Sequence, residues 1–119
     1  MAANARVLVI DDYPQILRFI RLALQSRGYR VTTVGSGEEG LEKLESEPPD
    51  VILLDIRMPD MDGFEFMARA KELNDPPVIA YSATPEFAGR ALKNGARAFL
   101  RKPLDLDQLV ELLEELTAG

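Results

Sequence analysis

Five polar side chains stand where hydrophobic runs of the sequence end, and their types suit a metal ion and a phosphoryl group. They are Asp11, Asp12, Asp55, Ser82 and Lys102. Three close carboxylates would repel one another, and a divalent cation with oxygen ligands would remove that repulsion. Mg²⁺ suits such a site because it keeps positions for water and phosphate oxygens. A lysine as a point charge and a hydroxyl as a donor would complete a receptacle for a phosphoryl group.

In such a receptacle Asp55 can act as a nucleophile, because attack of a carboxylate on phosphorus gives an aspartyl phosphate. This reaction needs mainly positioning and charge neutralisation. Taken singly, the residues have simpler explanations. Asp11 or Asp12 could cap the next helix, Ser82 could be a turn residue, and Lys102 could be a solvated charge. A shared site is favoured because separate strands would otherwise have to place suitable groups at one edge by coincidence.

Nearby residues are expected to be structural. Thr84 stands before Pro85, and we expect it to cap a helix. Asp60 and Asp62 are expected to shape or cap the loop into the next helix, with Gly63 allowing a tight turn.

The elements that must position these side chains alternate along the chain. The expected strands are residues 6–10, 30–34, 51–54, 78–81 and 98–100. Stretches with helical spacing of apolar residues lie between them. Some of the runs are continuously apolar, which indicates central strands of a parallel sheet that is covered on both faces. The alternation predicts a doubly wound α/β fold, in which ligands bind outside the carboxyl ends of the strands.

Several residues indicate where the helices begin and end. Pro14 and Pro85 suit first-turn positions, and Ser36 with Glu39 has the spacing of a capping box. Gly95 is expected to stop a helix.

Composition limits the classes of function. The 119 residues are 46% apolar and 29% charged, which fits one globular domain. The chain has no cysteine and no histidine, so a thiolate nucleophile, an imidazole metal site and a phosphohistidine on this chain are excluded. A net charge of −6 argues against nucleic-acid binding. No segment resembles a signal peptide or a membrane span, so we expect a cytoplasmic protein without direct contact to nucleic acid or membrane.

Four segments, in this order and at these separations, closely resemble the receiver domain of two-component response regulators, in the chemotaxis-regulator-like superfamily. They are residues 7–12, 51–63, 77–83 and 95–103, so the resemblance covers essentially the whole chain. It implies a (βα)5 fold with a five-stranded parallel sheet in the order 2-1-3-4-5 and helices on both faces. It also implies one receiver domain over residues 1–119, with its elements between about 6 and 117.

The resemblance implies a role for each acidic residue. Asp55 would be the phosphorylation site in a reaction that depends on Mg²⁺, with Mn²⁺ as an alternative ion. Asp12 would bind the metal directly and Asp11 through water, and the backbone carbonyl of Arg57 would complete the protein's metal contacts. The chain would then be a signalling switch, not an enzyme in the usual sense, that catalyses its own phosphorylation and dephosphorylation.

The resemblance also implies how the phosphoryl group would be held and sensed. Ser82 Oγ and the Ala83 amide would bind phosphoryl oxygens, Lys102 would pair with the phosphate, and the Lys102–Pro103 peptide would be cis. Ser82 would move toward the phosphate and Phe99 would turn inward. Phe99 is also explained simply as a core aromatic of the fifth strand, and the two explanations are compatible. The surface of the fourth helix, fifth strand and fifth helix would change as a result.

A phosphodonor must come from outside because the chain has no histidine. By resemblance the donor is a sensor histidine kinase or a phosphotransfer protein, with small-molecule donors as an alternative. Kinases of such systems commonly dock on the first helix, where Arg18, Arg21 and Arg27 would favour an acidic partner; a solvated face explains them equally well. The effector would be a separate protein or a further domain of a longer chain, and a phosphorylation-dependent homodimer is a further expectation.

Two other functions are open to a chain of this kind. A Mg²⁺-dependent phosphohydrolase of the haloacid dehalogenase type needs a second aspartate two residues after its nucleophile. Here Tyr13 follows Asp11 at that spacing and Arg57 follows Asp55, which argues against it. A degenerate receiver that only docks partners is not favoured, since all the phosphorylation groups are present.

Overall fold

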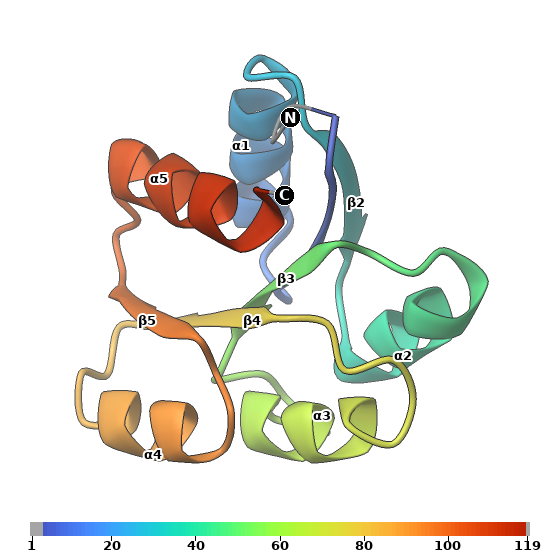
Figure 1. Ribbon diagram of the computed structural model, residues 1–119. Coiled ribbons are helices and arrows are strands. Elements are labelled where there is room, and N and C mark those ends of the chain that lie inside the picture. Colours follow the sequence, from blue (N-terminus) through green and yellow to red (C-terminus); the bar gives the residue numbers. More distant parts are fainter. Residues whose placement is uncertain (1–3, 119) are drawn as a thin grey trace.

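The computed structural model describes residues 4–118, and the predicted alternation of strands and helices is present throughout them. The strands are β1 (Arg6–Ile10), β2 (Arg30–Val34), β3 (Val51–Asp55), β4 (Val78–Ser82) and β5 (Ala98–Arg101). The helices are α1 (Pro14–Gln25), α2 (Gly37–Ser46), α3 (Gly63–Ala70), α4 (Phe87–Lys93) and α5 (Leu106–Thr117). All strand pairs are parallel, and the order β2-β1-β3-β4-β5 confirms the predicted topology (Figure 1).

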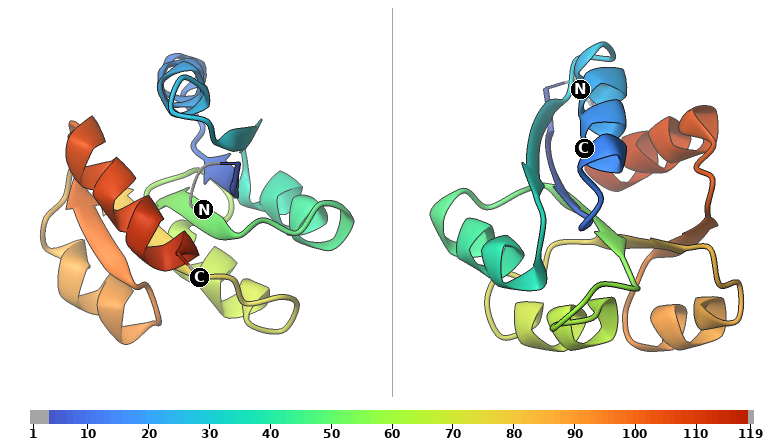
Figure 2. Two further views of the ribbon diagram at one scale, coloured as in Figure 1. Left: turned by 45° about the horizontal axis from the view of Figure 1, so that its top comes forward. Right: turned by 180° about the vertical axis from the view of Figure 1, so that it is seen from behind.

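Helices cover both faces of the sheet. α1 and α5 lie over one face and α2, α3 and α4 over the other, as the two further views also show (Figure 2). On β1, Val7 and Val9 belong to the core cluster under α1 and α5, while Leu8 and Ile10 belong to the cluster under α2, α3 and α4. Since successive side chains of a strand point to opposite faces, a strand covered on both sides must be apolar at every position.

Several helix boundaries follow from the residues that predicted them. Pro14 occupies the first turn of α1. Ser36 caps α2, where its Oγ accepts a hydrogen bond from the Glu39 amide at 3.2 Å. Gly95 adopts a φ of 109° just after α4, a conformation that favours glycine and ends the helix.

The predictions for Thr84 and Pro85 are wrong. α4 begins only at Phe87, and Glu86 occupies the N-cap position. The carbonyl of Thr84 accepts a hydrogen bond from the Phe87 amide at 3.2 Å, and Pro85 accepts one from Ala88 at 3.1 Å. These bonds form a tight turn between β4 and α4, so the two residues precede the helix.

Three strands, β3, β4 and β5, extend one residue further than the apolar runs predicted, and in β3 and β4 the extra residue belongs to the expected site. Asp55 is the last residue of β3 and pairs with Tyr81 of β4, and Ser82 pairs with Arg101 of β5. Backbone pairing therefore fixes both residues at the carboxyl edge of the sheet.

No helix in the described part of the chain combines the length and the apolar character that a membrane crossing requires.

Candidate functional site: an acidic cleft at the carboxyl edge of the sheet

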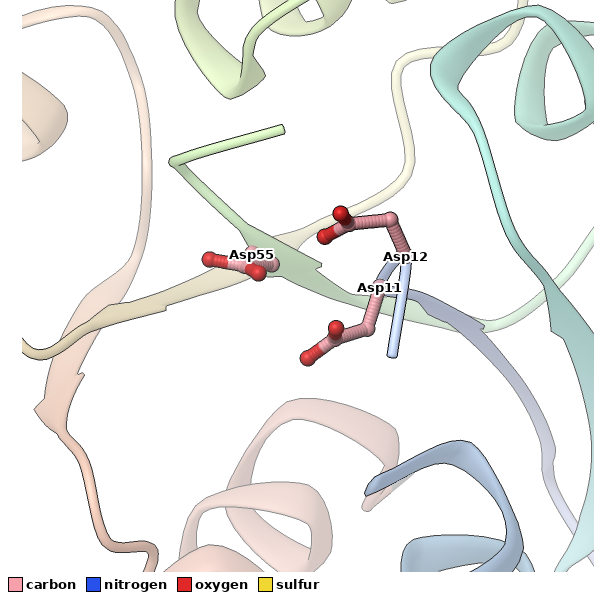
Figure 3. Close-up of side chains that lie close together, drawn as sticks. All are labelled: Asp11, Asp12 and Asp55. Atoms are coloured by element: carbon pink, nitrogen blue, oxygen red, sulfur yellow. The ribbon is translucent and has the colours of Figure 1, made fainter. Parts of the chain in front are cut away.

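The carboxyl ends of the central strands bring the predicted side chains together. Asp11 and Asp12 follow β1, and Asp55 ends β3; their carboxylates lie close together in Figure 3, and each offers an oxygen within 4.8 Å of the others. An open cleft of about 800 Å³ lies over this edge. Its lining includes Asp12, Asp55, Arg57, Ser82, Ala83 and Lys102.

Asp55 is buried and held from two sides. Its Oδ2 lies 3.2 Å from Lys102 Nζ, and its Oδ1 accepts a hydrogen bond from the Arg57 amide at 3.2 Å. Burial and the nearby charge of Asp11 raise the pKa of Asp55 to about 6, although Lys102 opposes the shift. Lys102 therefore does not fully stabilise the ionised form of Asp55, and a further cation nearby would stabilise it.

Asp11 is fully buried, and both of its oxygens have donors. Oδ1 accepts a hydrogen bond from the Tyr13 amide at 2.9 Å. Oδ2 accepts one from the hydroxyl of Tyr81 and lies 3.6 Å from Lys102 Nζ. Tyr13 is the N-cap residue of α1, and its own side chain makes no capping hydrogen bond. The capping explanation for Asp11 is thus wrong, because Asp11 bonds the amide of the N-cap residue and not a free amide of the first helical turn.

Asp12, unlike Asp11, has a carboxylate oxygen that lacks a donor within the described residues. Its Oδ1 is buried and has no hydrogen-bond partner among residues 4–118. A buried acceptor without a partner is costly in free energy, and a divalent cation with oxygen ligands would satisfy it. Together with the neighbouring carboxylates of Asp11 and Asp55, this donor set fits a divalent metal ion.

Ser82 and Lys102 lie on the other side of Asp55. Ser82 is buried, its Oγ accepts a hydrogen bond from the Thr84 amide at 3.0 Å, and its carbonyl accepts one from the Lys102 amide. The Lys102–Pro103 peptide bond is cis. Phe99 is half-buried and packs against the core cluster under α2, α3 and α4, outside the lining of the cleft.

The sequence did not single out Tyr81. It is fully buried on β4, its hydroxyl donates to Asp11, and its ring centroid lies 4.9 Å from Lys102 Nζ. Burial, and then the negative charge of Asp11, raise the pKa of Tyr81, so the phenol remains a proton donor. The sequence did contain a signal for the contact between Tyr81 and Asp11. A buried tyrosine hydroxyl usually has a hydrogen-bond partner, and an aspartate was expected at the same edge of the sheet.

An aromatic wall of the cleft was also missed. The rings of Phe64 and Phe87 meet edge to face at 5.6 Å, and the guanidinium of Arg90 lies 3.7 Å from the Phe64 ring centroid. All three residues line the cleft beside Asp55. Helical spacing identified apolar faces but not which of their members border the site.

Known proteins share both the sequence and the fold. Residues 7–114 match the family described as the response regulator receiver domain. The transcriptional regulatory protein KdpE of Mycobacterium tuberculosis is 39% identical over 109 residues, which are 90% of this chain and 48% of that protein. The chain thus spans about half the length of this relative.

Two solved structures are similar over nearly their whole length. The receiver domain of the Francisella response regulator 1452 has a TM-score of 0.88 and 33% identity, over 95% of this chain and 96% of that one. The chemotaxis protein CheY4 of Vibrio cholerae has a TM-score of 0.84 and 32% identity, over 96% of this chain and 99% of that one. With the acidic cleft at the carboxyl edge of the sheet, these matches establish that the chain belongs to the response regulator receiver domain family of two-component signalling.

Proposed function

We propose that this chain is a switch that accepts a phosphoryl group on Asp55 and passes the resulting change to a partner protein. One observation carries the proposal: the buried Asp55 carboxylate lies 3.2 Å from Lys102 Nζ and beside the carboxylates of Asp11 and Asp12. A nucleophile, a fixed cation and a metal-binding donor set therefore border one cleft. Residues 1–119 would act as one receiver unit.

The environments of the two neighbouring aspartates support different roles. Asp12 has a buried oxygen that finds no partner in the described part of the chain, which suits direct coordination of Mg²⁺ or Mn²⁺. Asp11 already accepts hydrogen bonds on both oxygens, which suits contact with the metal through water. Asp55 and the backbone carbonyl of Arg57 would complete the protein ligands. When bound, the ion would neutralise charge on the carboxylates and the incoming phosphoryl oxygens.

The transfer itself is a displacement at phosphorus. An oxygen of Asp55 forms the new P–O bond as the P–N bond of a phosphohistidine breaks, and the leaving imidazole keeps the bonding electron pair. Ser82 Oγ and the Ala83 amide would donate hydrogen bonds to the phosphoryl oxygens. Lys102 would exchange its ion pair with Asp55 for one with the phosphoryl group. Attack of water on the same phosphorus would break the P–O bond to Asp55 and release inorganic phosphate with the free carboxylate, so the chain would also catalyse its own dephosphorylation.

The proposed signal runs from Ser82 to Phe99. A movement of Ser82 toward the phosphoryl group would break the hydrogen bond that its Oγ accepts from Thr84. Phe99 is half-buried on β5 and pairs in register with Ala80 of β4. An inward turn of Phe99 would alter the α4–β5–α5 surface, which would then bind an effector, a further domain or a second copy of this chain.

The phosphodonor would be a histidine kinase or a phosphotransfer protein that docks on α1. The exposed face of this helix carries Phe19 and Leu22, which are 54% and 61% exposed. Two arginines already have partners: Arg21 on this helix donates to Thr33, and Arg27, which lies beyond the end of α1, pairs with Asp107. Docking through the exposed side chains of Phe19 and Leu22 is therefore better supported than attraction of an acidic partner by the arginines.

Intact-mass analysis with a small phosphodonor and Mg²⁺ tests the central claim. The wild-type protein should gain one phosphoryl group, and Asp55→Asn should gain none. Asp75→Asn is a matched control, because Asp75 is exposed and lies outside the cleft. Equal labelling of wild type and Asp55→Asn, or no labelling of wild type, would contradict the proposal.

A further inference from the structure

A buried phenol contacts the cluster of Asp11, Asp12 and Asp55 from a strand that does not neighbour β1. Tyr81 lies on β4, and β3 separates β4 from β1 in the sheet. The side chain is fully buried and belongs to the core cluster under α1 and α5. Its hydroxyl nevertheless donates a hydrogen bond to Oδ2 of Asp11, which follows β1. The proposed phosphorylation reaction gives this hydroxyl no part.

The hydroxyl completes the hydrogen bonding of Asp11. Oδ1 is held by the Tyr13 amide and Oδ2 by Tyr81, so donors from two different elements fix the rotation of the carboxylate. The ammonium of Lys102 is 3.6 Å from the same Oδ2 and 4.9 Å from the Tyr81 ring centroid. Tyr81 thus contacts both the acidic and the basic members of the cleft.

We infer that Tyr81 is a positioning residue of the metal site: its hydroxyl holds Asp11 in the orientation that a bound divalent cation and its water require. This inference rests on the proposed function, because it presumes that Mg²⁺ binds in the cleft. Groups that hydrogen-bond a metal ligand orient it and tune its affinity, and their loss typically weakens metal binding 10- to 100-fold. Within residues 4–118, Asp12 Oδ1 has no such partner, so the orientation of Asp11 is the one that the protein fixes before metal binding.

A purely structural role for Tyr81 makes a different prediction. Phenylalanine would fill the same core space beneath α1 and α5 and keep the ring near Lys102, and only the hydroxyl would be lost. If the ring alone matters, Tyr81→Phe should leave metal binding unchanged. If the hydroxyl positions Asp11, the dissociation constant for Mg²⁺, measured by calorimetry, should rise about 10-fold.

Tyr29→Phe is a matched control. Tyr29 is also buried, belongs to the same core cluster, and stands just before β2, at the opposite edge of the sheet from the cleft. The same chemical change there should leave the Mg²⁺ dissociation constant at its wild-type value. Thermal melting of both variants would show that each is folded.

A second measurement needs no substitution at position 81. In wild-type protein with labelled tyrosine, the hydroxyl proton of Tyr81 should give an NMR signal that exchanges slowly with water, because it is buried and bonded to a carboxylate. Absence of a slowly exchanging signal from Tyr81 would overturn the inference.

The outcomes separate the inference from the proposed function. If wild type binds Mg²⁺ and Tyr81→Phe binds it as tightly as Tyr29→Phe does, the positioning role is lost while the proposed phosphorylation site stands. If wild type binds no Mg²⁺, both are lost.

Discussion

Two corners of the acidic cleft hold their aspartates in different ways. At the β1 corner, residues 11–13, the Tyr13 amide holds Oδ1 of Asp11, and two side chains from elsewhere, Tyr81 and Lys102, contact its Oδ2. At the β3 corner, residues 55–63, Lys102 and the Arg57 amide hold the carboxylate of Asp55, and backbone bonds place the residue itself. Asp55 is the last paired residue of β3, and the Gly63 amide closes the following loop by donating to the Ile56 carbonyl at 2.9 Å.

The difference shows which contacts each corner depends on. Asp11 depends on side-chain donors for its orientation, so removal of one donor should disturb it. The place of the nucleophile at the end of a paired strand depends on the backbone. Lys102 joins the corners, since its Nζ lies 3.2 Å from Asp55 and 3.6 Å from Asp11. Substitutions that cut this link, or disturb one corner only, should therefore have separable effects on metal binding and on transfer.

Loss of the link should have the largest effect. Lys102→Ala should slow phosphorylation about 100- to 1,000-fold, because a fixed cation that stabilises the transferred group is removed. Mg²⁺ binding should be largely retained, since its ligands are the carboxylates of both corners. Calorimetry and the rate of mass gain would measure the two quantities, with Lys93→Ala on the exposed side of α4 as the control. Unchanged phosphorylation would remove the role of Lys102.

The β3 corner should make the metal-free protein depend on pH. Burial, and then Asp11, raise the pKa of Asp55 from an ordinary value of 3.8 to about 6. The folded state therefore holds this proton more tightly than the unfolded chain does. The cost of the charged carboxylate is fully present above about pH 6 and is lost as the pH falls from about 6 to 3.8, so this group makes the protein more stable toward acid pH. The shift corresponds to about 2–3 kcal/mol.

Comparison with Asp55→Asn isolates that contribution, because the amide does not titrate. Without divalent cations, the variant should be more stable than wild type at neutral pH, and the difference should shrink as the solution is acidified toward about pH 4. Urea unfolding at several pH values would measure it. A difference that grows on acidification has the wrong sign and would show that Asp55 is stabilised, not strained, by its surroundings.

Gly63→Ala should damage the β3 corner alone. A Cβ at this position would lie 2.8 Å from Ile56 Cα and 3.1 Å from the Asp55 carbonyl oxygen, so the backbone itself would have to shift. We expect a loss of about 1–3 kcal/mol in the free energy of unfolding and weaker Mg²⁺ binding, because the moved loop carries Arg57. Gly89→Ala is the control: nothing lies within 4 Å of its added Cβ, and α4 should become slightly more stable.

The sequence predicted the elements and most of the site because parallel strands share one carboxyl edge. Apolar runs that alternate with helical stretches predicted the strands. The polar residues that end those runs were therefore expected to lie together at one edge of the sheet. The strand order came from the resemblance, since periodicity does not specify which strands pair. The apolar runs ended one residue early at Asp55 and Ser82, because backbone pairing continues where hydrophobicity stops.

The two corners also differ in how far the sequence could describe them. Asp62 was expected to shape or cap the loop at the β3 corner, and its Oδ1 does accept a hydrogen bond from the Glu65 amide three residues later. Such local contacts follow from spacing alone. Tyr81 and Asp11 lie 70 residues apart, and their contact depends on the sheet order and on a side chain that reaches across β3. Hydrophobic patterning assigns a strand tyrosine to the core and does not predict the hydrogen-bond partner of its hydroxyl.

The capping residue of α3 gives the smallest predicted effect and the finest test of the comparison. Asp62→Ala removes the hydrogen bond to the Glu65 amide and should cost about 1 kcal/mol of stability. Ser36→Ala removes the equivalent bond in α2 and should cost about as much. If the β3 corner is held by strand pairing and by the close approach at Gly63, both variants should bind Mg²⁺ with the wild-type dissociation constant. Weaker binding in Asp62→Ala alone would mean that the cap of α3 also holds the nucleophile's loop in place.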